Sequence, residues 1–293
     1  MSTPQPGDAL RTLPDSNWER GPSSHAEHLV EAGHVLQFPN LPFALEKDEQ
    51  RFLDPSWSDG RSKNISLRGA TELRGAQGGK DDLAALQAMI RRFAANAQAL
   101  VDRMFPQYRG KLRAGNASLR PFAVEGRESS WRKDDTRLHV DAFPSNPTQG
   151  VRLLRVFTNL NPVGRPRIWR VGEPFADFAN RFSPRLRRPL PASSFLLHAL
   201  HITKSRRTPY DHAMLQLHDL AKADLEFQSA SPQQEVAFAP GTTWVVFSDQ
   251  VLHAVMAGQH MMEQTFYLRP TDQLAPETSP LRVLESLLHK TLV

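Results

Sequence analysis

The sequence predicts a mainly β protein, built as a barrel or double sheet with helices on its outside. Two observations carry this prediction. From about residue 118 onward, short alternating or apolar segments are separated by Gly, Pro and Asn, as expected for a series of strands. Before them, one long stretch repeats apolar residues every three or four positions, which is the period of a helix. One helix followed by many short strands favours a β architecture with flanking helices.

The 293 residues are expected to divide into a flexible leader over 1–28 and a single domain over 29–293. The leader is rich in Pro, Ser and other polar residues and shows no period. The domain is expected to contain an N-terminal supporting helix over about 81–105. A mostly helical insert is expected over about 174–225, and a capped amphipathic helix over about 280–292 closes the chain.

Composition excludes several classes of protein. Hydrophobic residues make up 40% of the chain and charged residues 23%, which excludes wholesale disorder. No apolar run reaches the roughly 18–20 residues that span a bilayer, and no secretory signal is visible. The chain has no Cys, which fits a cytosolic protein. Any metal site must therefore be built from His and carboxylates.

Positive charge is concentrated in the middle of the chain. Lys+Arg number 36 and Asp+Glu 31, a net charge of +5, whereas the segment from Arg120 to Arg207 has 17 basic and 7 acidic residues, an excess of +10. Arg pairs well with carboxylate and phosphate, so this segment predicts an anionic ligand or surface, although any single Arg is more often simply solvated. Because no basic repeat is interleaved with aromatic residues, nucleic acid is not expected as a partner.

His139 and Asp141 are two positions apart in an expected strand over 137–143, so their side chains point to the same face. An H-x-D tripeptide alone is a weak signal because it arises often by chance. A distal His253 at the start of a later strand, and Arg269 at the end of the next, make the pattern more specific. Two His and one carboxylate leave open positions on non-haem Fe(II), and an Arg can pair with the carboxylate of 2-oxoglutarate.

Other histidines are weaker candidates for the metal. His260 is a rival for the distal ligand, but Gly258 to Met261 is expected to form the turn after that strand. His198 and His201 could form a ligand pair on a helix, although a surface or packing role is more common for such residues.

Four segments resemble one known family: HVDAFPS over 139–145, LRVFTNLNP over 154–162, PRIWRVGEPF over 166–175 and QVLHAVMAGQ over 250–259. The family is that of the Kdo hydroxylases, Fe(II)/2-oxoglutarate-dependent dioxygenases that act on 3-deoxy-D-manno-oct-2-ulosonic acid (Kdo). The resemblance covers roughly residues 30–292. It implies a double-stranded β-helix, the jelly roll (cupin-like) fold of the 2-oxoglutarate oxygenases.

The resemblance also implies a reaction, its cofactors and a location. Fe(II), 2-oxoglutarate as cosubstrate and O₂ would hydroxylate C3 of Kdo in Kdo-lipid A, in the inner core of lipopolysaccharide. The product would be D-glycero-D-talo-oct-2-ulosonic acid, with succinate and CO₂ as co-products. The enzyme would be peripheral, on the cytoplasmic side of the bacterial inner membrane. Its basic surface is expected to bind anionic lipid, whereas the C-terminal helix is expected mainly to pack against the barrel or a partner subunit.

Roles follow for individual residues. His139, Asp141 and His253 would hold the iron, and Arg269 would pair with 2-oxoglutarate. Further 2-oxoglutarate contacts are expected from a strand after the H-x-D motif, where core or sheet-edge roles are about as common: Arg155, Thr158 and Asn159. Candidates for the substrate carboxylate, each weak on its own, are Arg127, Arg132, Arg167 and Arg170. Trp131 and Trp169 are more often core residues than sugar platforms.

Two alternatives to this function stay open at the level of the sequence. One is a 2-oxoglutarate oxygenase with another anionic substrate. The other is a non-catalytic jelly-roll module that binds a sugar acid, although a mere binder would not need an intact H-x-D…H set. The oligomeric state is not predicted.

Overall fold

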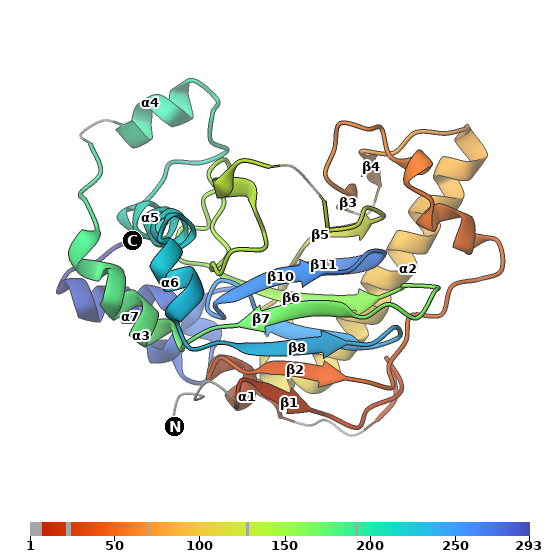
Figure 1. Cartoon of the computed structure of the whole chain (residues 1–293), viewed down its shortest axis with the longest axis horizontal. Coiled ribbons are helices and arrows are strands. Elements are labelled where there is room, and N and C mark those ends of the chain that lie inside the picture. Colours follow the sequence, from red (N-terminus) through yellow and green to blue (C-terminus); the bar gives the residue numbers. More distant parts are fainter. Residues whose placement is uncertain (1–7, 22–24, 70, 127–128, 191–192) are drawn as a thin grey trace.

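A computed structural model describes residues 8–21, 25–69, 71–126, 129–190 and 193–293. Within these residues the strands form two sheets, a large one in the order β1-β2-β9-β6-β11-β5-β3-β4 and a small one in the order β10-β7-β8 (Figure 1). Two sheets with helices on the outside agree with the predicted core, but the chain as a whole is mixed α/β and not mainly β, because its described helices contain more residues than its strands.

The large sheet is antiparallel except for the parallel pair β1 and β2. Its central strands β6 and β9 are buried along their whole length, because both faces of the sheet are covered. The strands of this sheet are β1 (Leu10–Thr12), β2 (Val35–Phe38), β3 (Ile65–Arg68), β4 (Glu72–Arg74), β5 (Arg113–Arg120), β6 (Arg152–Asn159), β9 (Thr243–Phe247) and β11 (Met261–Leu268).

The small sheet is antiparallel and lies over one face of the large sheet. Its strands are β7 (Arg167–Val171), β8 (Gln234–Phe238) and β10 (His253–Ala257). Large aromatic side chains from both sheets meet between them: Trp244 lies flat against Phe238, with ring centroids 4.1 Å apart, and Trp169 contacts both Phe157 and Trp244 edge-on. This apolar layer closes one part of the space between the sheets.

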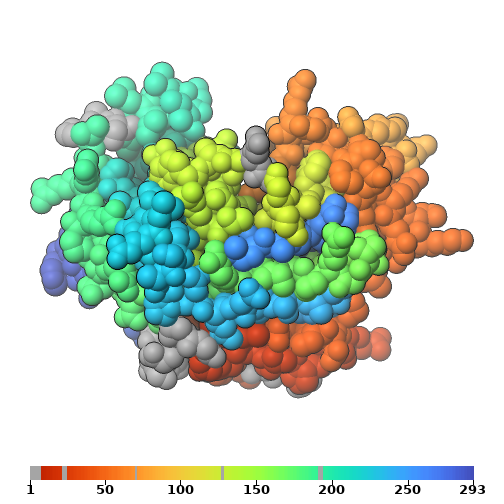
Figure 2. Space-filling model, in the orientation of Figure 1, coloured from red at the N-terminus to blue at the C-terminus, as the bar shows by residue number. Residues whose placement is uncertain are grey.

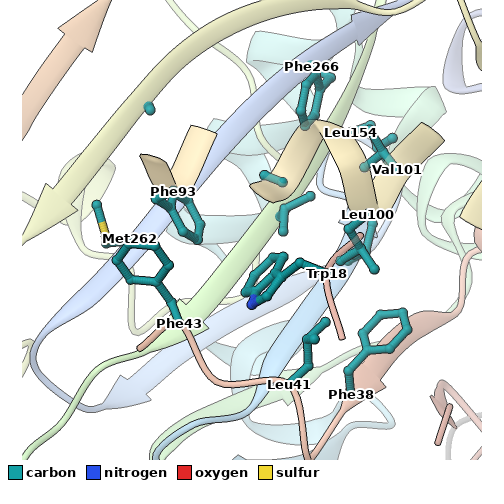
Figure 3. Close-up of a cluster of buried hydrophobic side chains, with 14 of the residues drawn as sticks. Trp18, Phe38, Leu41, Phe43, Phe93, Leu100, Val101, Leu154, Met262 and Phe266 are labelled. Carbon is teal, nitrogen blue, oxygen red and sulfur yellow. The ribbon is translucent and has the colours of Figure 1, made fainter. Parts of the chain in front are cut away.

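The other face of the large sheet packs against α2 (Lys80–Met104). Ile90, Phe93 and Leu100 are fully buried in one cluster with Leu154 of β6 and Phe266 of β11. Figure 3 labels Phe93, Leu100, Leu154 and Phe266 of this cluster. The predicted supporting helix over 81–105 is thus confirmed within one residue at each end. Alternation along the strands follows from this layering: Leu154 and Val156 face the helix, whereas Arg155 and Phe157 face the small sheet.

A second group of helices covers the end of the small sheet, in and after the predicted insert. Aromatic residues of α3 (Phe175–Phe182) pack against α5 (Pro209–Ala223), α6 (Leu225–Ala230) and α7 (Pro280–Leu288). α4 (Ser193–Ala199) stands apart from this cluster (Figure 1). On α7, Leu281 and Leu284 are buried, so its apolar side serves packing, as expected for the C-terminal helix. Remaining short helices are α1 (Glu27–Glu31) and several 3₁₀ turns.

The described part of the predicted flexible leader over 1–28 is ordered, so that prediction is wrong for residues 8–21 and 25–28. Leu10–Thr12 pair with β2 in the large sheet, and Trp18 packs among Phe93 and Phe43 in the main core (Figure 3). The polar composition concealed these contacts because a single buried Trp and a three-residue strand give no period. Residues 1–7 and 22–24 lie outside the described residues. No helix of the described chain is long and apolar enough to cross a membrane.

Candidate metal centre

Three side chains converge between the two sheets. His139, Asp141 and His253 each offer one ligand atom, and these atoms all lie within 4.8 Å of one another. Both histidines are buried, at 5% and 4% exposure. The predicted triad is therefore brought together by the fold. In the described part of the chain, no other His or carboxylate cluster has this geometry.

The H-x-D segment is not the regular strand that the sequence predicts over 137–143. It forms one isolated antiparallel bridge, in which His139 and His253 exchange both backbone hydrogen bonds, at 2.9 and 2.8 Å. The Asp141 backbone N–H donates to the Ser248 carbonyl at 2.9 Å, so the segment stays extended for two residues. Residues i and i+2 point to the same side on this short extended stretch, so His139 and Asp141 converge although the predicted strand is absent.

Both imidazoles are oriented by their Nδ1 atoms. Nδ1 of His139 lies 2.7 Å from the Arg137 carbonyl, and Nδ1 of His253 lies 2.8 Å from the Val251 carbonyl. A carbonyl oxygen only accepts, so each Nδ1 carries the proton and each Nε2 keeps its lone pair for a metal. Burial lowers the pKa of both rings, which favours the neutral form that binds metal.

Asp141 is held as a carboxylate by Arg155. Burial alone would raise the pKa of Asp141, but the Arg155 guanidinium, whose Nη1 donates to it at 2.6 Å, holds that pKa far below its ordinary value. Nη2 of Arg155 donates to Glu263 at 2.6 Å, and Arg120 donates to the same carboxylate at 2.6 Å. These charges form a buried chain from Arg120 through Glu263 and Arg155 to Asp141.

Aromatic rings enclose the two histidines. Trp169 stacks on His253 with centroids 4.9 Å apart and planes 20° apart. His218 of α5 lies edge-on to His139, with centroids 5.4 Å apart. Trp169 is 1% exposed, so it is a core residue that also shapes the wall of the site. Such packing restricts the rings to one orientation.

The triad lies in a large open cavity of about 1920 Å³ between the sheets and the α5 side of the molecule. Alternate residues of β6, β7, β10 and β11 line its floor. Twelve Lys or Arg side chains line it against four Asp or Glu, so its field attracts anions. The predicted basic middle segment supplies most of these cations.

Arg167 is a buried cation of the cavity that forms no ion pair with any described carboxylate. It is 3% exposed, its Nε has no hydrogen-bond partner, and its Nη1 reaches only the Gly258 carbonyl at 3.5 Å. Burial lowers the pKa of Arg167 to about 9, and the nearby positive charge of Arg120 contributes. A buried cation in this state is stabilised by an anion placed in the cavity.

The structure does not bring Arg269 to the cavity, which contradicts its predicted role. β11 ends at Leu268, and Pro270 begins a 3₁₀ turn in which Asp272 binds the Arg269 guanidinium at 2.7 Å. The Arg269 side chain is 72% exposed on the outside of the molecule.

Thr158 and Asn159 were also expected near 2-oxoglutarate, and neither lines the cavity. Thr158 bonds to Thr243 within the sheet, and the Asn159 amide donates to the Phe238 carbonyl at 2.9 Å. These bonds link β6 to β9 within the large sheet and β6 to β8 of the small sheet. Arg155, predicted with them, does reach the site.

The arginines predicted to bind substrate lie in different places in the structure. Arg132 lines the cavity mouth, where it stacks on Trp131 at 4.1 Å and pairs with Asp219, and Arg167 lines the interior. Arg170 lies outside the cavity lining, where it bonds to the Thr136 carbonyl. Arg127 lies outside the described residues.

Several cavity residues were missed from the sequence. Glu263 and His218 touch the residues around the metal centre, and Asp135 pairs with Lys63 and faces Lys222. Burial alone would raise the pKa of Asp135, but the Lys63 ammonium that binds it lowers that pKa. The positions of these cavity residues depend on contacts between strands and helices that are far apart in the sequence. Only the excess of basic residues in the middle of the chain hinted at such a network.

Comparison with known proteins gives the family. The family model described as 3-deoxy-D-manno-oct-2-ulosonic acid (Kdo) hydroxylase matches residues 15–291. The chain belongs to the Kdo hydroxylase family. No match was found among curated proteins.

Solved structures agree. The crystal structure of the Kdo hydroxylase KdoO, a non-haem Fe(II) α-ketoglutarate-dependent dioxygenase, in complex with α-ketoglutarate and Fe(III) is 46% identical, with a TM-score of 0.93. The alignment covers 97% of each chain. The apo structure of KdoO is 46% identical to this chain, with a TM-score of 0.94. The KdoO complex with succinate and Fe(III) is also 46% identical, with a TM-score of 0.93, and both alignments cover 97% of each chain. The predicted family and enzyme class are confirmed by these matches.

Proposed function

We propose that this chain hydroxylates C3 of Kdo in Kdo-lipid A, using Fe(II), O₂ and 2-oxoglutarate (the α-ketoglutarate of the crystallised relative). The observation that carries the proposal is the buried His139, Asp141 and His253 set at the floor of a cation-lined cavity. In the overall reaction one oxygen atom of O₂ enters succinate as CO₂ leaves, and the other becomes the new hydroxyl of the sugar.

The donor set fits Fe(II). Two neutral imidazoles and one carboxylate are the ligands of the non-haem oxygenases, and they leave positions open for a cosubstrate and O₂. When bound, the iron supplies O₂ activation. The protein's part is to hold both Nε2 lone pairs toward one point, to keep Asp141 ionised through Arg155, and to fix the His253 ring by stacking it on Trp169.

We assign the distal carboxylate of 2-oxoglutarate to Arg167 in place of Arg269. Both Nη atoms of Arg155 already bind carboxylates, Asp141 and Glu263, whereas the Arg167 Nε has no hydrogen-bond partner and its Nη1 has only the long bond to the Gly258 carbonyl. A bidentate carboxylate would satisfy those donors and neutralise the buried charge. Arg120, next to Arg167, adds to the attraction.

The pairing of the strands supports a double-stranded β-helix. Strands β5, β11, β6 and β9 are neighbours in the large sheet. Opposite them, the 139–141 segment joins β10, β7 and β8 through the His139–His253 bridge. Eight segments in two facing sets of four make such a jelly roll, with the metal ligands at one end. The described residues 8–21 add an outer strand to the same domain.

The basic mouth of the cavity suits a substrate that carries carboxylate and phosphate groups. Arg132, whose guanidinium lies over the Trp131 ring, is the most exposed of the described arginines predicted to bind substrate. Because the acyl chains of such a glycolipid are embedded in a bilayer, we place the enzyme peripherally on the cytoplasmic side of the inner membrane.

The assay that tests this function measures succinate formed from 2-oxoglutarate with Kdo-lipid A, with deacylated Kdo sugars, and with no sugar. Stoichiometric succinate and hydroxylated Kdo are expected with either sugar substrate, and none with Asp141→Ala. Succinate formation that depends on a different anionic acceptor would change the substrate. Sugar binding without any succinate would instead indicate a binding module.

A further inference from the structure

Exposed apolar side chains gather on one short segment of the surface. Phe195, Leu196, Leu200 and Ile202 are each more than half exposed, on α4 and the turn that follows it. Leu196 and Leu200 are one helical turn apart, with the Leu200 N–H donating to the Leu196 carbonyl at 2.9 Å. Other large exposed apolar residues, such as Val163 and Leu225, are scattered singly. A cluster of this kind marks an interaction site.

The same segment carries a strong positive charge. Between Asp177 and Asp211 the sequence has no acidic residue, while six basic residues flank α4: Arg185, Arg187, Arg188, Lys204, Arg206 and Arg207. Arg185 pairs with Asp224. The other five make no ion pair with any carboxylate that the structure describes. The Arg206 guanidinium lies over the Phe195 ring at 5.2 Å, so cationic and apolar groups are adjacent.

This segment is anchored at the rim of the cavity. The Lys204 backbone N–H donates to the Ser145 carbonyl at 3.0 Å, and the Arg207 guanidinium donates to the Pro144 carbonyl at 2.6 Å. Both acceptors follow closely after Asp141 in the chain. Ser194 at the start of α4 donates to the Arg207 carbonyl at 2.7 Å. In Figures 1 and 2 the teal α4 projects from the body of the molecule.

We propose that the described residues 186–190 and 193–207 form the membrane-docking element of the protein, and that its partner is the surface of an anionic bilayer. The apolar side chains of α4 enter the interface while the surrounding cations bind lipid headgroups, as in other interfacial amphipathic segments. The element would set the cavity mouth against the membrane. This inference deepens the proposed function, because it states how a lipid-embedded sugar reaches the metal centre, but its binding test requires no turnover.

Charge complementarity selects this partner. A second copy of the chain would bring like charges together around the apolar cluster, whereas an anionic bilayer accepts both the charges and the apolar groups. The C-terminal α7 offers no comparable surface, since Leu281 and Leu284 are buried in the protein.

The first experiment is sedimentation with two kinds of vesicle. One kind contains phosphatidylcholine alone, and the other also contains roughly 30% phosphatidylglycerol, an anionic lipid. We expect binding to the anionic vesicles that weakens with salt. F195S/L196S/L200S/I202S should weaken it at least tenfold, and R188Q/R206Q should remove most of the salt dependence. The matched control V163S/L225S/L274S removes exposed apolar groups elsewhere and should bind as the parent does. Equal binding by the α4 variant would overturn the proposal.

A second measurement does not depend on loss of binding. Phe195→Trp places a reporter in the segment, and we expect its fluorescence to be quenched by brominated lipid in anionic vesicles. An unquenched reporter on bound protein would place another surface at the membrane. If size-exclusion chromatography showed a dimer that the α4 variant converts to monomer, the cluster would be a subunit interface, which also overturns the proposal.

A third measurement separates this inference from the proposed function. Turnover of a deacylated Kdo sugar by F195S/L196S/L200S/I202S should equal that of the parent, while turnover of vesicle-embedded Kdo-lipid A should fall at least tenfold. If neither sugar is turned over by the parent but vesicle binding still depends on α4, the proposed function fails and the docking element stands. Equal loss on both substrates would contradict a docking role.

Discussion

Arg155 donates one 2.6 Å hydrogen bond to Asp141 and its other arm binds Glu263. The guanidinium is thus the only described cation that touches a metal ligand directly, and it is 8% exposed. Its position fixes the orientation of the carboxylate and keeps it charged. The metal centre therefore depends on a residue that would not itself bind the metal.

Replacing Arg155 with Met should lower both stability and metal affinity. Removal of the cation leaves buried carboxylates uncompensated, which costs about 3–5 kcal/mol of unfolding free energy. Loss of the partner of a ligand should weaken Co(II) binding by about 10–100-fold. Denaturant unfolding and metal titration measure the two effects. Arg120→Met is the matched control, since it removes a Glu263 contact and leaves Asp141 bound; near-equal Co(II) affinity in both variants would contradict the assignment.

Alanine at His139, Asp141 or His253 should each abolish turnover and reduce bound iron to background, as measured by elemental analysis after reconstitution. His260 is the control for the distal ligand, because it lies in the turn between β10 and β11 with φ of 58°. His260→Asn suits that conformation and should retain iron and activity. An iron-free His260→Asn enzyme would show that the distal ligand is assigned wrongly.

The two candidate arginines for 2-oxoglutarate should behave differently. Arg167→Met should raise the apparent KM for 2-oxoglutarate at least tenfold, because the cavity loses its unsatisfied bidentate donor. Arg269→Met should leave that KM unchanged, since Arg269 is on the outside with Asp272. Steady-state kinetics at saturating sugar provide the comparison. The reverse ranking would restore the role predicted from the sequence.

Mildly acidic pH should lower the unfolding free energy of the metal-free protein, at pH values above those at which its carboxylates become protonated. Burial lowers the pKa of His34, His212 and His260 in the folded state. In the unfolded chain these groups titrate near 6.5, so the fold is favoured fully above that pH and loses stability as pH falls below it. Denaturant unfolding should show a lower free energy at pH 5.5 than at pH 7.5. His260→Asn should reduce the slope, and a flat profile would contradict the burial of these rings.

The metal triad was predictable because its evidence is local. Two ligands share one face of an extended segment, and that needs only two residues of regular backbone. The strand predicted there is absent, yet Asp141 and His139 still point together because their backbone groups bond to one neighbouring segment.

Arg269 could not be placed correctly from the sequence because its location depends on where a strand ends. β11 stops one residue earlier, and Pro270 turns the chain away from the cavity. Glu263 was missed for a related reason. Its contact with Arg155 follows from the register of β11 on β6, in which Glu263 opposes Phe157 and Thr265 opposes Arg155. No periodicity along one strand reports such a register.

The reciprocal backbone bonds between His139 and His253 have a consequence for the order of assembly. These residues are far apart in the chain, so the two imidazoles meet only after the intervening strands and helices have closed a long loop. The metal ligands therefore come into position late in folding. We therefore expect iron to bind after the two sheets have assembled, in contrast to zinc in a finger domain, which is needed for the fold to form.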